Sequence, residues 1–201
     1  MDIYLNFDGV LHPDQVFYED GCIPSLLAPG HNAFEYAELL AMTLEGYEDV
    51  VIILNTWWTF YLGLDACKDL LPTALAARIG GSTIQYLDAY DSMPTRLKEA
   101  ESHIARRRSR PWVILDHNNA RYRRDFLPHL LLLDPSEGLG NRSAQRSVER
   151  RLRLLQKNEQ HHPINQASRL YRLKDSAFRP LSFEVEQRGR QTCYLHENTY
   201  T

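Results

Sequence analysis

The sequence has no long hydrophobic run and few cysteines. Its longest apolar runs, such as Val50–Leu54 and Leu130–Leu133, are far too short to cross a bilayer. The first residues, MDIYLNFDG, lack a basic region followed by an apolar stretch, so we expect no signal peptide and no membrane partner. The three cysteines, Cys22, Cys67 and Cys193, are scattered without metal-ligand spacing. This favours free thiols in a reducing cytoplasm over a disulfide framework or a zinc site.

Positive charge is scarce in the first half of the chain. Residues 1–95 contain 2 Lys or Arg against 14 Asp or Glu, whereas residues 96–201 contain 21 against 12. Most of the positive side chains are arginines in three clusters: Arg106, Arg107, Arg108 and Arg110; Arg121, Arg123 and Arg124; and Arg142, Arg146, Arg150, Arg151 and Arg153. Because Arg contacts phosphate bidentately, the clusters indicate a nucleic acid or another phosphorylated polymer as partner. The alternative is that basic helix faces are solvated or pair with the acidic half.

Short apolar runs alternate with helix-like stretches, which predicts an α/β fold around a mostly parallel sheet. The 201 residues, 43% apolar and 24% charged, fit one soluble globular domain with an appendage. We expect strands at 3–7, 50–54, 112–115 and 130–133, and helices at 32–46, 64–78 with a break at Pro72, 94–108, and from a cap at Asn141 to about Gln156. Residues 13–31 are rich in Pro and Gly and read as irregular.

The end of the chain differs in kind, because apolar periodicity is lost from residue 157 onward. We therefore predict a domain over residues 1–156 and a C-terminal extension over 157–201. Two short β-like runs in the extension predict a hairpin at 182–195.

Polar side chains follow three of the predicted strands at the point where each ends. These are Asn6 and Asp8 after the first strand, Asn55 and Thr56 after the second, and Asp116, His117 and Asn118 after the third, with Arg96 and Lys98 opening the preceding helix. In open parallel sheets, ligands bind outside the carboxyl ends of the strands. Carboxylates, small hydrogen-bonding residues and a cation in one place suit Mg²⁺ and a phosphate group.

Asn6-Phe7-Asp8-Gly9-Val10 resembles the first motif, Asp-x-Asp-Gly-[Val/Thr], of the haloacid dehalogenase (HAD) superfamily, known mainly for phosphatases. The run Asp8–Pro13 resembles a small branch of it that includes HAD domains of RNA-repair proteins. Further segments match in order: Val51–Trp58, Leu71-Pro72 with Ala77–Thr83, Arg96-x-x-Glu99 before Pro111–Asp116, and Leu132–Pro135 with Gly138-Leu139. The resemblance extends from residue 3 to about 155 and implies a HAD-like Rossmannoid three-layer sandwich.

The resemblance also implies roles for individual residues. In the family the first Asp attacks phosphorus and the second is the general acid and base, and these positions are Asn6 and Asp8 here. Asp116, together with Asn6 and Asp8, corresponds to the Mg²⁺ site. For phosphate binding, the resemblance implies Asn55 or Thr56 at the Ser/Thr position and Arg96 or Lys98 as the cation.

Three positions depart from the family pattern. A carboxamide is a very poor nucleophile, so Asn6 predicts an inactive or strongly impaired phosphatase. His117 replaces the second Asp of the metal strand, and a hard cation disfavours imidazole, so we expect weakened Mg²⁺ binding. Asn55 stands at the Ser/Thr position. A single engineered change would leave the other positions standard; three joint departures favour natural divergence.

The intervals between the predicted strands are too short for a full cap domain, so the site would be open to large ligands. Two functions remain: a HAD-type phosphatase relative, and a pseudo-phosphatase that binds a phosphorylated macromolecule or nucleic acid. The other aromatic and imidazole side chains fit structural roles. His12 belongs to a turn, His117 is structural or solvent-facing, and Trp57, Trp58 and Trp112 pack in the core.

Overall fold

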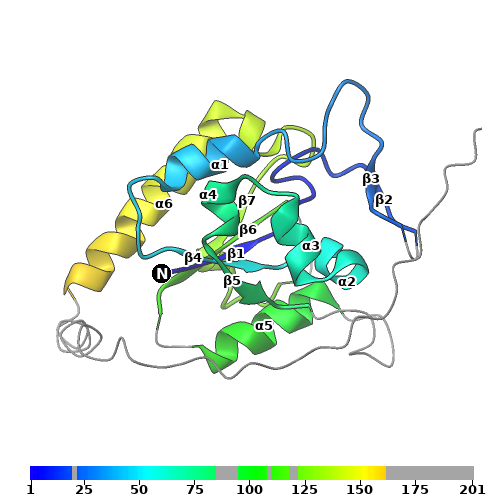
Figure 1. The fold of residues 1–201 in the computed structure, drawn as a ribbon. Coiled ribbons are helices and arrows are strands. Elements are labelled where there is room, and N and C mark those ends of the chain that lie inside the picture. Colours follow the sequence, from blue (N-terminus) through cyan, green and yellow to red (C-terminus); the bar gives the residue numbers. More distant parts are fainter. Residues whose placement is uncertain (20–21, 85–94, 108–109, 118–121, 162–201) are drawn as a thin grey trace, which may run out of the picture. The chain divides into compact units, whose positions relative to one another are not determined.

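A five-stranded parallel sheet with the strand order β5-β4-β1-β6-β7 forms the centre of the fold (Figure 1). The computed structural model describes residues 1–19, 22–84, 95–107, 110–117 and 122–161. The strands of the sheet are β1 (Asp2–Leu5), β4 (Val51–Leu54), β5 (Ile79–Ser82), β6 (Trp112–Asp116) and β7 (Leu130–Leu132). A separate antiparallel pair, β2 (Val16–Phe17) and β3 (Ser25–Leu26), lies within residues 13–31.

Helices cover both faces of the sheet, which confirms the predicted three-layer α/β fold (Figure 1). Helix α5 (Arg96–Arg106) packs on one face, and α1 (Ala37–Leu44) and α6 (Arg142–His161) lie on the other. The shorter helices are α2 (Trp58–Leu62), α3 (Leu64–Asp69) and α4 (Thr73–Ala76), with 3₁₀ turns η2 (Leu127–His129) and η3 (Gly138–Gly140). None of the helices in the described ranges is long and apolar enough to cross a bilayer.

The central strand β1 is buried along its whole length, because parallel strands with helices on both faces meet no solvent. Successive side chains alternate between the two cores. Ile3 and Leu5 join the core beneath α1 and α6, whereas Tyr4 joins the core beneath α5. The register pairs Leu5 with both Leu54 of β4 and Leu115 of β6. The carboxyl ends of these three strands are therefore level, and the residues that follow them lie side by side.

Strand β5 and helix α2 were not predicted from the sequence. Strand β5 contains Gly80 and Gly81, and glycine weakens the β pattern. At Gly80 the reason for glycine is close packing, since a Cβ there would lie 2.5 Å from Val51 Cγ1 on the neighbouring strand. The missing side chain lets β5 approach β4.

Helix α6 begins as predicted and ends later. The side-chain oxygen of Asn141 accepts hydrogen bonds from the backbone N–H groups of Ser143 (2.7 Å) and Ala144 (3.3 Å), which is the geometry of an N-cap. The helix continues to His161, beyond the expected end at Gln156, and stops two residues before Pro163.

The chain divides into two compact units, Met1–His161 and His162–Thr201. The hairpin predicted at 182–195 lies outside the described residues, and the division between 156 and 157 stays a prediction.

The two described cysteines differ in environment, which predicts different reactivity. Cys67 is fully buried, and burial raises the pKa of its thiol to about 12, whereas Cys22 is partly exposed. Because the thiolate is the reactive form, we expect iodoacetamide at mildly alkaline pH to label Cys22 and to leave Cys67 unmodified. Peptide mapping by mass spectrometry measures both sites. Labelling in urea should equalise them, and equal rates in the native protein would contradict the described burial.

Candidate functional site

The predicted site residues from three strands meet at the carboxyl end of the sheet. Asn6 follows β1, Asn55 follows β4, and Asp116 ends β6. Arg96, the first residue of α5, reaches the same place from outside the sheet. Their exposed fractions are 1%, 0%, 0% and 8%, so a cluster of polar and charged groups is enclosed at the edge of an apolar core.

Arg96 and Asp116 form a buried ion pair in which the guanidinium grips both carboxylate oxygens. Arg96 Nη1 donates to Asp116 Oδ2, and Nη2 donates to Oδ1 at 3.3 Å. Nη1 also lies 3.5 Å from the backbone oxygen of Asn55. Burial by itself would lower the pKa of Arg96, but the Asp116 carboxylate outweighs it and the pKa is raised. Arg96 is therefore a permanent cation, committed to Asp116.

Three neutral groups donate to the same carboxylate. Tyr122 Oη donates to Asp116 Oδ2 at 2.8 Å, the backbone N–H of His117 to Oδ1 at 2.8 Å, and Asn6 Nδ2 to Oδ1 at 3.3 Å. Burial, followed by the charge of Asp116, raises the pKa of Tyr122, so its hydroxyl keeps the proton that it donates. The negative charge of Asp116 is thus compensated by protein groups alone.

The Asn6 amide bridges two oxygens. Its Nδ2 donates to the backbone oxygen of Asp8 at 2.8 Å as well as to Asp116 Oδ1. Its Oδ1 is buried and accepts no hydrogen bond from any group in the described ranges. One buried polar atom of the nucleophile position is therefore left open.

The Asp8 carboxylate is held by three side chains from different segments. Trp58 Nε1 donates to Oδ1 at 2.8 Å, His12 Nε2 lies 3.2 Å from the same oxygen, and Tyr18 Oη donates to Oδ2. The backbone N–H of Phe34 donates to His12 Nδ1 at 3.2 Å, which leaves the ring proton of His12 on Nε2, facing Asp8. Burial and the Asp8 charge raise the pKa of Tyr18, which therefore stays a donor.

Asn55 and Thr56 face groups of the protein. Asn55 Nδ2 donates to Tyr122 Oη at 3.1 Å, and its Oδ1 accepts from Thr83 Oγ1 at 2.8 Å. Thr56 Oγ1 accepts from the backbone N–H of Trp58 at 3.4 Å. Asn55 thus fixes the ring of Tyr122, and Thr56 orders the entry into α2.

Backbone N–H groups gather at the same edge. Among the described residues we find no hydrogen-bond acceptor for the N–H groups of Phe7 and Asp8, after β1, or of Thr56 and Trp57, after the adjacent β4. N–H groups without an acceptor are uncommon in the interior of proteins. Several such donors at neighbouring strand ends suit an anion.

Two predicted residues lie elsewhere. Lys98 is exposed on the first turn of α5, and Arg96 occupies the position that faces Asp116. The His117 side chain points to Asp14, with 3.6 Å between Nδ1 and Oδ2. Only its backbone N–H takes part in the site. Asn118 is outside the described residues.

The residues as placed do not fit Mg²⁺. The oxygens that could converge on an ion are Asn6 Oδ1, the backbone oxygen of Asp8, and the carboxylate of Asp116. The Asn6 NH₂ group donates hydrogen bonds to the last two of these, and Arg96 donates to both carboxylate oxygens of Asp116. The described part of the chain also holds no group of three or more His, Cys, Asp or Glu that could bind a metal.

Several residues that build the site were missed from the sequence: His12 was assigned to a turn, Trp58 to the core, and Tyr18, Thr83 and Tyr122 to no role. For Trp58 a signal existed, since it follows the second strand by a few residues and its indole N–H needs an acceptor when buried. Tyr18 lies in a segment of irregular composition, where no periodicity gives the direction of a side chain.

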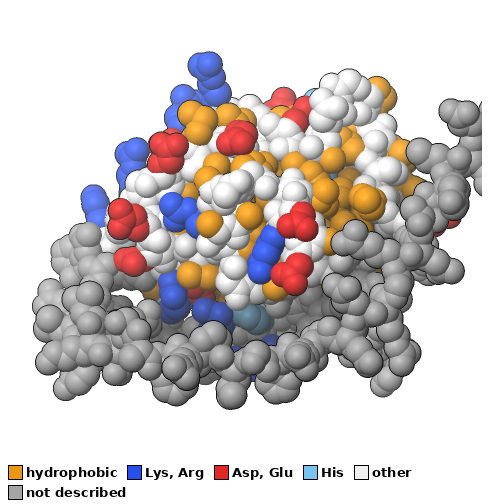
Figure 2. All heavy atoms as spheres, in the orientation of Figure 1, with side chains coloured by type: hydrophobic (Ala, Val, Ile, Leu, Met, Phe, Trp, Pro, Cys, Tyr) orange, Lys and Arg blue, Asp and Glu red, His pale blue; other side chains and the backbone are white. Residues whose placement is uncertain are grey.

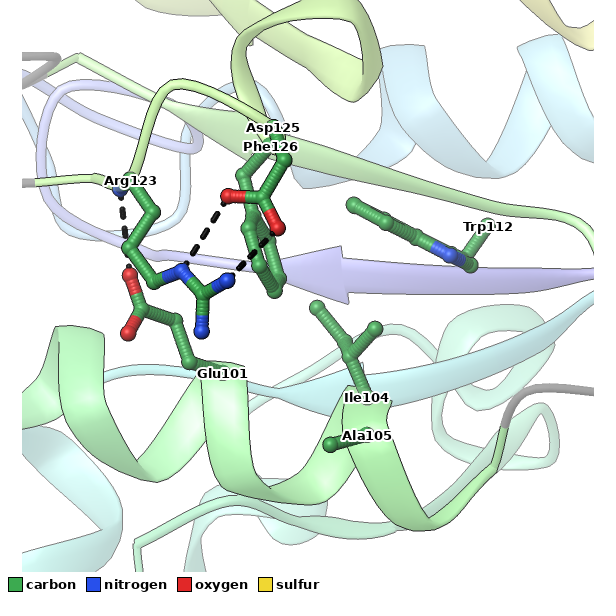
Figure 3. A pocket seen from close by; sticks show the side chains of 7 residues that line it. All are labelled: Glu101, Ile104, Ala105, Trp112, Arg123, Asp125 and Phe126. Carbon is green, nitrogen blue, oxygen red and sulfur yellow. Dashed lines mark hydrogen bonds and ion pairs between the residues drawn. The ribbon is translucent and has the colours of Figure 1, made fainter.

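A pocket of about 370 Å³ lies at the opposite, amino end of β6 (Figure 3). Its lining consists of Glu101, Ile104, Ala105, Trp112, Arg123, Asp125 and Phe126. Arg123 is already paired with Asp125, at 2.9 Å between Nη2 and Oδ2. No residue of the polar cluster contributes to this pocket, so we place the candidate site at the carboxyl strand ends, where the chemistry converges.

Comparison with known proteins gives one family. The model of the HAD domain in Swiss Army Knife RNA repair proteins matches residues 3–144. Neither the curated proteins nor the solved structures contain a significant match. The matched range includes strands β4, β5, β6 and β7, strand β1 from Ile3 on, and every residue of the polar cluster. A HAD-like parallel sheet, a motif that follows β1 and a family match over residues 3–144 agree, and the chain belongs to the HAD domains of Swiss Army Knife RNA repair proteins.

Proposed function

We propose that this HAD domain binds the phosphorylated end of a nucleic acid at the carboxyl ends of β1 and β4 and does not cleave the phosphate ester. The observation that carries the proposal is Asn6, a carboxamide at the nucleophile position of an otherwise assembled polar cluster. HAD domains generally attack phosphorus with a carboxylate at this position. The amide oxygen is uncharged, and its lone pairs are delocalised into the C–N bond, so it does not replace that attack.

The position of Asp8 supports the same conclusion. As a general acid, Asp8 would carry a proton toward the leaving oxygen. Both of its carboxylate oxygens already accept hydrogen bonds, from Trp58 and His12 on one and from Tyr18 on the other. These three contacts fix the carboxylate against groups of the protein. In this arrangement Asp8 orders the loop after β1.

Phosphate recognition in this proposal uses groups that remain available. The N–H groups of Phe7, Asp8, Thr56 and Trp57 provide donors, and the hydroxyl of Thr56 can add its proton. Lys98 supplies a positive charge from the exposed first turn of α5, whereas Arg96 acts indirectly, by holding the Asp116 carboxylate in place. A metal ion is not needed for these contacts, and Mg²⁺ would have to displace the Asn6 NH₂.

Nucleic acid is favoured over a phosphoprotein by the family and by the arginines of α6. The side chains of Arg142, Arg146 and Arg150 make no hydrogen bond or ion pair with any described residue. Figure 2 shows basic side chains along the edge of the molecule where Figure 1 places α6. Other arginines serve the fold, since Arg107 and Arg110 both pair with Asp2, at 3.2 and 2.9 Å. Cysteines that are scattered along the sequence without metal-ligand spacing support a cytoplasmic setting.

The test combines hydrolysis with binding. We expect the unmodified chain to release no p-nitrophenol from p-nitrophenyl phosphate in the presence of Mg²⁺. Fluorescence anisotropy should show that an RNA oligonucleotide with a terminal phosphate binds at least about tenfold more tightly than the same RNA without it, a difference of about 1.4 kcal/mol. A triple Arg142→Ala, Arg146→Ala, Arg150→Ala variant is the control. This variant should bind both RNAs more weakly by the same factor, and its binding should depend less on salt concentration.

The second candidate is a phosphatase relative whose remaining machinery is intact. It is favoured by the convergence of Asp8, Asp116 and Arg96 next to position 6. Turnover by Asn6→Asp would support this ancestry, whereas turnover by the unmodified chain would overturn the binding proposal. Equal affinity for phosphorylated and unphosphorylated RNA would overturn it as well.

A further inference from the structure

We infer that the Asn6 NH₂ group takes the place of a divalent cation, so that this crevice is assembled without metal. Asn6 Nδ2 lies 2.8 Å from the backbone oxygen of Asp8 and 3.3 Å from Asp116 Oδ1. Two oxygens of different segments, one of them formally charged, thus converge on one partly positive NH₂ group. An amide with two protons can satisfy both acceptors at once.

The orientation of the amide follows from its neighbours. If the Asn6 side chain turned by half a rotation, Oδ1 would face the Asp8 carbonyl and the Asp116 carboxylate. Three buried oxygens would then meet with no proton between them, an arrangement that is costly unless a cation enters. In the observed orientation the open atom is Oδ1, which carries no formal charge. The chain therefore places its unsatisfied group where the electrostatic cost is lower.

The charges around Asn6 agree with this reading. With Asn at position 6, the cluster holds the carboxylates of Asp8 and Asp116 and the guanidinium of Arg96. Arg96 grips Asp116 with two donors, and Asp8 is held by three donors of its own. An Asp at position 6 would put a third carboxylate against the Asp8 carbonyl and Asp116. Like charges at such a site destabilise the ionised forms unless a cation compensates them.

Two consequences separate this chain from a metal-dependent one. Its stability should be the same with and without Mg²⁺, and Asn6→Asp should create a Mg²⁺ requirement that the unmodified chain lacks. A further consequence concerns the ligand and rests on the proposed function: binding of a phosphorylated RNA end should be unaffected by chelation.

The experiment measures thermal unfolding of the full chain and of two variants in EDTA and in MgCl₂ up to about 10 mM, with NaCl matched for ionic strength. A ligand that binds only the native state raises Tm progressively with its concentration. We expect no Mg²⁺-specific change for the unmodified chain. For Asn6→Asp we expect a lower Tm in EDTA and a rise with Mg²⁺. If Asn6→Asp does not fold in EDTA, recovery of its native circular dichroism by Mg²⁺ gives the same readout.

Asn6→Ala is the matched control, because it removes the bridging NH₂ without adding a charge. Its Tm should fall in both buffers and should not recover with Mg²⁺. The inference is overturned if Mg²⁺ raises the Tm of the unmodified chain as much as that of Asn6→Asp, or if Asn6→Asp is indifferent to Mg²⁺. These outcomes involve no phosphorylated ligand. If the chain fails to bind RNA, the proposed function is overturned, but the inference about Asn6 and Mg²⁺ is not affected.

Discussion

Arg96→Met is expected to lower the free energy of unfolding by about 3–5 kcal/mol, the range for breaking a buried ion pair by removing one partner. Asp116 is fully buried and Arg96 is its only cationic partner among the described residues. Tyr122, Asn6 and the backbone of His117 would still donate to the carboxylate, but none of them carries a compensating charge. Urea unfolding followed by circular dichroism measures the change.

Two further variants make this result specific. Arg96→Met combined with Asp116→Asn removes both charges and should recover a large part of the loss. Arg124→Met changes an exposed arginine beyond the cluster and should stay within about 0.5 kcal/mol of the unmodified chain. A loss under 1 kcal/mol for Arg96→Met alone would mean that the buried pair is not formed.

Gly138→Ala should destabilise the protein more than any other glycine-to-alanine change that we consider. Gly138 has φ +47°, and a Cβ there would lie 2.7 Å from the backbone oxygen of Val10. The neighbouring N–H of Leu139 donates to the same oxygen at 2.9 Å, so neither backbone can withdraw freely. The left-handed conformation costs about 1–2 kcal/mol for a residue with a Cβ. Overpacking adds about 1–3 kcal/mol.

Gly30→Ala measures the first contribution, the cost of the left-handed conformation, without the second. Gly30 has φ +80°, but a Cβ there would meet nothing within 4 Å. Its substitution should therefore cost only the conformational part. The difference between the two variants in urea unfolding reports how tightly η3 is pressed against the loop after β1. Equal losses would show that Val10 is not in contact with position 138.

Much of the fold was predictable because its signals are local. The strand at residues 50–54 is a continuous β-branched run, and its neighbours around 3–7, 112–115 and 130–133 are likewise apolar and short. Strand β5 could not be found in this way, because Gly80 is explained by Val51, a residue 29 positions away in the sequence. The pairing of a glycine with a bulky neighbour on another strand becomes visible only after the chain has folded.

The site residues likewise fall into those that a local signal predicts and those that depend on the folded structure. Asn6, Asp8 and Asp116 were found because a single rule places ligands at the carboxyl ends of parallel strands. His12 and Trp58 were assigned to structural roles, and their contact with Asp8 depends on loop conformations that no periodicity encodes. The choice between Arg96 and Lys98 needed the helix phase: one residue opens α5 facing the sheet, and the other lies two positions on, toward solvent.

The enclosure of the polar cluster bears on how such a chain changes over evolutionary time. Arg96, Asp116 and Asn55 are as inaccessible as the surrounding leucines, and each would leave an orphaned partner if it were lost. Selection for folding alone would then preserve them, whether or not turnover is selected. Buried polar residues of this kind are kept by fold maintenance, and on their own they are weak grounds for assigning an activity.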